Sequence, residues 1–153
     1  MNIWNRRERR MTDREAAARD WLNRHSWRLE EIKGLELQLE EMRAAINKTV
    51  KPPKEVSVQT QPRNVQDEKI SEIVDFEKRI QSKRDEYNLL QKTTIDTINR
   101  LDPSKRIILL YRYIYHRSWR YISGKLHYTE SYCFELHVKA LNSIYPLIDF
   151  SAK

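Results

Sequence analysis

The sequence predicts an all-α protein in which a long antiparallel helical hairpin, coiled-coil-like in its spacing, precedes a C-terminal helix-turn-helix module. Three observations support this prediction. Only two of the 153 residues are glycine, whereas β-rich folds use many glycine turns. Apolar residues recur at alternating spacings of three and four over two long stretches, as they do along one face of a helix. Asp102-Pro103 then opens a third stretch whose net positive charge is larger than that of the two before it.

The first helix is expected from about Thr12 to Lys48. Thr12 or Asp13 can cap its start, and Glu15 stands three residues after Thr12, as a capping box requires. Gly34 should cost about 1 kcal/mol relative to alanine, which marks either a tolerated weak point or a close approach by another helix. The heptad-like seam comprises Leu22, His25, Leu29, Ile32, Glu36, Leu39, Met42 and Ile46, widened by Trp21 and Leu35.

Residues 50–64 contain three prolines and show no helical period, which predicts a loop or flexible linker. A second helix should follow from about Val65 to Leu101, so that the two helices fold back as a hairpin within residues 1–101. Its seam comprises Ile73, Phe76, Ile80, Lys83, Tyr87, Leu90, Thr94 and Thr97, with an adjoining row of Ile70, Val74, Ile95, Ile98 and Leu101.

Polar residues interrupt both seams, at His25, Glu36, Lys83 and Thr94. Such residues often fix the register or the oligomeric state of a coiled coil at some cost in stability. The pattern is equally compatible with an intramolecular hairpin alone and with a homodimer formed through the helical hairpin.

Residues 102–153 are expected to form a separate module of three shorter helices. Asp102-Pro103 begins the first, because proline is favourable in a first helical turn. Ser118 should cap the second, which ends near Leu126, and Thr129 should cap the third. The side chains expected to face the core are Ile107, Leu110, Tyr111, Ile114, Trp119, Ile122, Leu126, Cys133, Leu136, Ala140, Leu141 and Ile144.

The last two of these helices, separated by Lys125–Tyr128, match the geometry of a helix-turn-helix. His127 occupies the turn position where glycine is common, and histidine tolerates a positive φ better than most residues. Residues 101–153 hold 8 Lys/Arg and 4 Asp/Glu, which gives +4 of the chain's net +7. This distribution is typical of a phosphate-binding surface. A plain three-helix bundle that binds no DNA is the alternative.

The stretch RIILLYRYIYHRSWRYISGKLHYTESYCFELHVKAL resembles region four of bacterial sigma factors. The whole chain resembles the ArpU/RinA-like phage regulators of Gram-positive bacteria, in detail over about residues 95–145 and in architecture before that. The resemblance implies a phage- or prophage-encoded activator of late genes that binds double-stranded DNA and can contact RNA polymerase. The matching residues are Ile98, Leu101, Asp102, Arg106, Ile108, Leu109, Arg112, Tyr113, Ile114, Ser118, Trp119, Ile122 and Leu126.

Docked as in those relatives, the module would place the first turns of the helix from Thr129 in the major groove. Glu130, Phe134 and Glu135 stand where basic or amide side chains are usual, so arginine–guanine readout is not open to them. The carboxylates could accept from a cytosine amine and Phe134 could contact thymine methyls, while flanking cations bind phosphates. Solvated cations and a packed Phe134 are the alternatives. The candidate DNA-binding residues are Arg117, Arg120, Lys125, Tyr128, Thr129, Glu130, Ser131, Phe134, Glu135 and Lys139.

A second basic feature is the cluster Arg6–Arg10, which could follow a DNA groove as an arm or form a charged, frayed helix end. No catalytic, metal or cofactor site is expected. The four histidines lack metal-ligand spacing with Cys133, and the sequence contains no glycine-rich phosphate loop or nucleophile elbow.

The expected location is the cytoplasm of a bacterial host. No apolar run approaches the roughly 20 residues that span a membrane, and a single cysteine suits a reducing compartment. Two other functions remain open beside transcriptional regulation. One is a DNA-packaging recognition subunit similar to a small terminase, and the other is a protein-docking module that does not read DNA.

Overall fold

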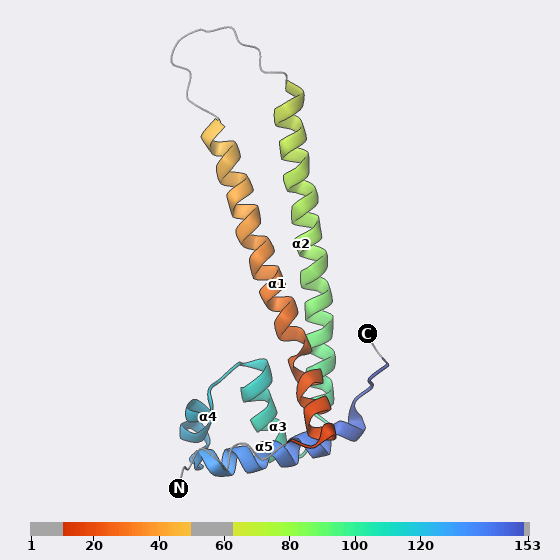
Figure 1. Ribbon diagram of the computed structural model, residues 1–153, viewed down its shortest axis with the longest axis vertical. Helices are drawn as coiled ribbons and strands as arrows, with labels where there is room; N and C mark the ends of the chain where they lie inside the picture. The colour runs from red at the N-terminus through yellow and green to blue at the C-terminus, as the bar shows by residue number, and fades with distance from the viewer. Residues whose placement is uncertain (1–10, 50–62, 152–153) are drawn as a thin grey trace. The chain divides into compact units, whose positions relative to one another are not determined.

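A computed structural model of the chain describes residues 11–49 and 63–151. These ranges contain helices and turns but no strand, which confirms the predicted all-α class. The helices are α1 (Asp13–Thr49), α2 (Arg63–Ile98), α3 (Pro103–Leu109), α4 (Trp119–Leu126) and α5 (Glu130–Ile144), with a π-helical turn η2 (Leu110–Ile114) and a 3-10 turn η3 (Tyr145–Leu147) (Figure 1).

The start of α1 is fixed by the predicted capping box. The Thr12 N–H donates to Glu15 Oε2 at 3.1 Å, and the Glu15 N–H donates to Thr12 Oγ1 at 3.3 Å. Glu15 is only 2% exposed, and its other oxygen accepts from Asn142 Nδ2 on α5 at 2.8 Å. The cap therefore also joins α1 to α5.

The boundary of α2 differs slightly from its prediction. The helix begins at Arg63, two residues inside the stretch expected to be a linker, and it ends at Ile98, before a short turn. Residues 50–62, which make up most of that expected linker, lie outside the described residues. Helix ends are the least certain part of a pattern-based prediction, because no apolar position marks them.

The described chain divides into two compact units: residues 11–25 with 89–151, and residues 26–49 with 63–88. This division differs from the boundary expected at residues 101 and 102. The same buried core as that of α5 contains Ala18, Trp21, Leu22 and Ile98. The start of α1 and the end of α2 are therefore part of the first unit.

In this first unit the buried face of α3 and η2 differs from the expected one. Ile108 and Leu109 are completely buried, whereas Ile107, Leu110 and Tyr111 are half-buried. Nearly every residue from 107 to 115 is apolar or aromatic, so the pattern does not mark one side. The five-residue turn η2 also departs from the α-helical period, because its bonds reach one residue further than in an α-helix.

Two of the polar residues that interrupt the predicted seams, His25 and Thr94, lie in the first unit, and both form hydrogen bonds. His25 is fully buried, and its Nε2 lies 3.0 Å from the carbonyl oxygen of Tyr113. Thr94 is also fully buried, and its hydroxyl donates to the Leu90 carbonyl of its own helix at 2.9 Å. Each of these bonds offsets part of the cost of burying a polar group.

The second unit is the antiparallel hairpin of the two long helices, as predicted. Ile32 and Ile80 are buried on its seam, while the rest of the expected seam is half-buried. A Cβ at Gly34 would meet nothing within 4 Å, so this glycine is a weak point rather than a site of close helix approach within the chain. Ion pairs join the two segments in the order expected of antiparallel helices, from Arg28–Glu86 at one end, through Glu31–Lys83 and Glu36–Arg84, to Arg43–Glu77 at the other.

Within the described ranges, the helices contain no apolar stretch that could cross a bilayer.

Candidate nucleic-acid interface

Helices α4 and α5 are each started by the predicted side-chain cap. Ser118 Oγ accepts the Tyr121 N–H at 3.2 Å, and Thr129 Oγ1 accepts the Tyr132 N–H at 3.1 Å. Each cap satisfies a backbone donor that has no partner inside its helix. The first residues of α4 and of α5 are therefore fixed by these caps, and one short turn joins the two helices.

The turn between α4 and α5 depends on His127, which adopts a left-handed conformation with φ of 57°. The N–H groups of His127 and Tyr128 both donate to the Ser123 carbonyl, the latter at 3.2 Å. In return, the Ser123 hydroxyl donates to the Tyr128 carbonyl at 2.6 Å. This closed set of bonds ends α4 and sets where α5 begins, in the manner of a helix-turn-helix.

The core face of α5 contains every residue expected there and one that was missed. Cys133, Leu136, Ala140, Leu141 and Ile144 are buried as predicted. Burial, followed by the charge of Glu130, raises the pKa of the Cys133 thiol. This side chain is therefore a small apolar core residue rather than a reactive thiol.

The missed core residue is His137, which is only 3% exposed. Its Nε2 lies 2.7 Å from the Tyr113 hydroxyl, and the two rings stack with centroids 5.7 Å apart. Burial and then the charges of Arg112 and Arg19 lower the pKa of His137 to about 4. Position 137 lies four residues after Cys133 and three before Ala140, a helical spacing that places it on the core face of α5. The prediction missed it because histidine is polar.

The exposed face of α5 presents Ser131, Tyr132, Glu135 and Lys139. Phe134 was expected on this face but is half-buried. Its ring packs edge-on against Trp119 of α4, with centroids 6.1 Å apart and planes at 72°. The packed alternative considered for Phe134 is therefore observed, although its partner is α4 rather than the hairpin. Glu130 is also half-buried, at the first turn of α5.

Four cations flank this face: Arg117, Arg120, Lys125 and Lys139, all of them exposed. Within the ranges that the structure describes, none of the four forms an ion pair. Arg117 instead lies 5.0 Å from the ring centre of Tyr121. On the described part of the hairpin, Arg28, Lys33, Arg43, Lys83 and Arg84 pair with carboxylates, whereas Lys48, Lys69, Lys78 and Arg79 form no ion pair. The four cations of the helix-turn-helix differ from these in lying around one exposed helix face.

Exposed tyrosines accompany these cations. Tyr128 and Tyr132 are 45% and 44% exposed, and their rings meet edge-on with centroids 4.9 Å apart. Tyr121, which the sequence prediction did not include as a site residue, is 44% exposed beside Arg117. Tyrosine hydroxyls can bond phosphate and ring edges can meet thymine methyls, so these side chains extend the candidate interface.

Within the described residues, no group of three or more histidine, cysteine or acidic residues is placed to hold a metal ion. The cluster Arg6–Arg10 lies outside those residues. Comparison of the chain with protein-family models, with curated proteins and with solved structures found no match.

Proposed function

We propose that the chain is a sequence-specific DNA-binding regulator of transcription whose reading element is α5. The observation that carries the proposal is the set of four exposed cations without carboxylate partners around an exposed helix face. Unpaired Arg and Lys side chains can displace the counterions of DNA, which supplies affinity and a strong dependence on salt.

In this proposal phosphate binding and base reading fall to different residues. Arg117, Arg120 and Lys125 lie on or just before α4, the helix that crosses the DNA backbone in such motifs. Ser131 and Glu135 on α5 face the base edges, where a carboxylate can accept from a cytosine amine. Phe134 packs against Trp119, so of the two aromatic residues on α5 that could contact thymine methyls we assign this contact to the exposed Tyr132.

The regulatory role extends the resemblance to sigma region four and to ArpU/RinA-like phage regulators. On that basis the chain would activate late genes of a phage or prophage by recruiting or contacting bacterial RNA polymerase in the cytoplasm of its host. Support for this step comes from the sequence likeness over about residues 95–145.

A selection from a random duplex library, followed by fluorescence anisotropy on the enriched sequence, tests the proposal. We expect one enriched motif, and for Arg117→Ala with Arg120→Ala a salt slope reduced by about 2, since each phosphate contact contributes about 0.9. Lys78→Ala with Arg79→Ala is the matched control, because it removes the same charge from exposed positions on α2. Enrichment of no motif, or equal losses in both double variants, would refute the proposal.

The packaging alternative is favoured by one observation: Trp27 is 80% and Leu37 is 59% exposed on α1. Large exposed apolar residues on a hairpin suit assembly of several copies. Native mass spectrometry separates the two functions, because a ring of eight or more chains fits packaging, whereas a monomer or homodimer fits regulation. A wild-type chain that binds duplex DNA only weakly and without sequence preference would instead favour a protein-docking module.

A further inference from the structure

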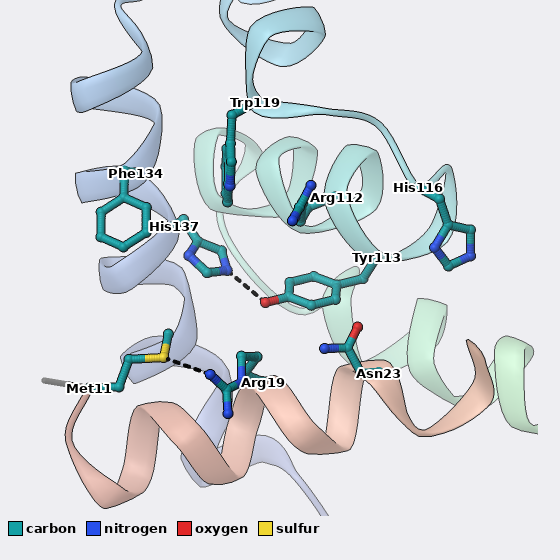
Figure 2. Close-up of a pocket in the computed structure, with 9 residues that line it drawn as sticks. All are labelled: Met11, Arg19, Asn23, Arg112, Tyr113, His116, Trp119, Phe134 and His137. Carbon is teal, nitrogen blue, oxygen red and sulfur yellow. Dashed lines mark hydrogen bonds between the residues drawn. The ribbon is translucent and has the colours of Figure 1, made fainter. Parts of the chain in front are cut away.

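A cavity of about 440 Å³ lies within the first compact unit, between α1, η2, α4 and α5. Figure 2 shows Arg19 of α1 and Arg112 of η2 on its walls, together with Trp119 of α4 and Phe134 and His137 of α5. The cavity therefore touches both helices of the helix-turn-helix from a side other than the exposed face of α5.

The walls of this cavity are positively charged. None of its lining residues is an aspartate or glutamate, and two are arginines. Arg112 lies 4.9 Å from the Trp119 ring centre and donates to the Arg117 carbonyl at 3.1 Å, and in the described chain it pairs with no carboxylate. Arg19 contacts Asp20 at 3.1 Å, but both side chains are exposed, so this pair is weak and leaves much of the charge available.

The charges of the Arg112 and Arg19 guanidinium groups both affect the pKa values of the buried residues His137 and Tyr113. Their charges add to the effect of burial in lowering the pKa of His137, and they oppose the effect of burial on the pKa of Tyr113. Glu15 and Asp20 act on His137 and Tyr113 in the opposite direction, and in each case they rank after the two arginines. An anion entering the cavity would meet both arginines.

The apolar part of the wall is aromatic and angular. The rings of Trp119 and Phe134 meet at 72°, and the His137 ring lies 4.9 Å and 5.9 Å from them, so the three form a continuous aromatic wall that a flat ring can contact. The volume falls in the range of about 300–1,000 Å³ typical of small-molecule sites. A protein partner would require a much broader surface, of roughly 800 Å² on each side.

We propose that this cavity binds a small aromatic anion, with Arg112 and Arg19 holding its charged group and with Trp119 and Phe134 contacting its ring. The lining of the cavity includes none of the exposed α5 residues that are proposed to read DNA. Guanidinium groups suit carboxylates in particular, because their paired N–H donors match the two oxygens.

Titration of the full-length chain with naphthalene-2-carboxylate, followed by ¹H–¹⁵N NMR, tests the proposal. The indole N–H signal of Trp119 is the local reporter, assigned by its loss in Trp119→Phe, and that of the exposed Trp27 is the reference. We expect a saturable shift of the Trp119 signal with a dissociation constant on the order of 1 mM, as suits a ligand of this size. Naphthalene-2-methanol, which is neutral, should bind about tenfold more weakly because it lacks the charge-assisted bonds.

Arginine variants then assign the charged contacts. Arg112→Gln and Arg19→Gln should each weaken binding of the carboxylate about tenfold and leave the neutral probe unaffected, while Arg112→Lys should retain part of the affinity. Arg120→Gln, outside the cavity, is the control. Because Arg19 is exposed, its variant tests the proposal even if Arg112→Gln does not fold.

Four results would overturn the inference. They are the absence of a saturable Trp119 shift, equal affinity for the two probes, unchanged affinity in both arginine variants, and a shift produced only by duplex DNA or an acidic peptide. The last result would identify the cavity as part of a surface for macromolecules instead.

Discussion

Replacing His137 with glutamine should remove much of the pH dependence of folding between pH 6.5 and about 4. The imidazole is 3% exposed and bonded to the Tyr113 hydroxyl, and its pKa is lowered from 6.5 to about 4, chiefly by burial. In the folded protein the ring stays neutral at pH values where the unfolded chain already binds a proton. Acidification therefore favours unfolding.

The magnitude follows from this difference in pKa. At about 1.4 kcal/mol for each pKa unit, the gap between 6.5 and about 4 corresponds to roughly 3 kcal/mol of unfolding free energy. This stabilisation is present in full above pH 6.5 and is lost as the pH falls through about 4. His25, whose pKa is also lowered, first by burial, adds a loss of the same sign.

Urea unfolding followed by circular dichroism measures the effect. Between about pH 7 and about pH 4.5, protonation linked to His137 should lower the unfolding free energy of the wild-type chain by roughly 2 kcal/mol. The His137→Gln variant lacks this contribution, so its unfolding free energy should fall by roughly 2 kcal/mol less over the same interval. The variant's lower stability at neutral pH does not matter, since the comparison is between two pH dependences. Equal pH dependences, or an NMR titration in which the His137 ring titrates near 6.5, would refute the reasoning.

The remaining predictions concern the stability of single variants and the ability of the C-terminal residues to fold alone. Gly34→Ala should raise the unfolding free energy by about 0.5–1 kcal/mol, because a Cβ there meets nothing within 4 Å; no gain in urea unfolding would contradict this. His127→Gly should raise it by about 0.5–1 kcal/mol, since glycine adopts φ of 57° without strain; His127→Ala is the control and should show no gain. Thr129→Ala should lower the unfolding free energy by about 1 kcal/mol, whereas Thr129→Ser should not, because the serine hydroxyl can accept the same hydrogen bond from the Tyr132 N–H. A fragment of residues 102–153 should lack the dispersed NMR spectrum of a folded protein, because Ala18, Trp21, Leu22 and Ile98 complete its core.

Local chemistry explains which parts of the fold could be predicted from the sequence. The capping box at Thr12, the caps at Ser118 and Thr129 and the left-handed turn at His127 each depend on residues within a few positions of one another. The apolar faces of α4 and α5 followed from spacing alone, because polar residues there clearly mark the opposite side.

The failures have a common physical origin in contacts between distant parts of the chain. The seam pattern showed that residues near Trp21 and Ile98 would be buried, but not that they would share a core with α5. The role of Phe134 depended in the same way on Trp119, which lies on another helix. A periodic pattern identifies the side of a helix that is buried but not the partner that buries it.

Glu15 shows why the candidate interface cannot be separated from the start of α1. One of its oxygens accepts from the Thr12 N–H at the start of α1, and the other accepts from Asn142, which is 127 residues further along the chain. Its burial makes loss of either bond costly, since an unpaired buried carboxylate is unfavourable. The position of α5 is therefore set partly by the first turn of α1. It follows that side chains on α1, remote in sequence from the helix-turn-helix, can alter the surface that α5 presents without belonging to that surface.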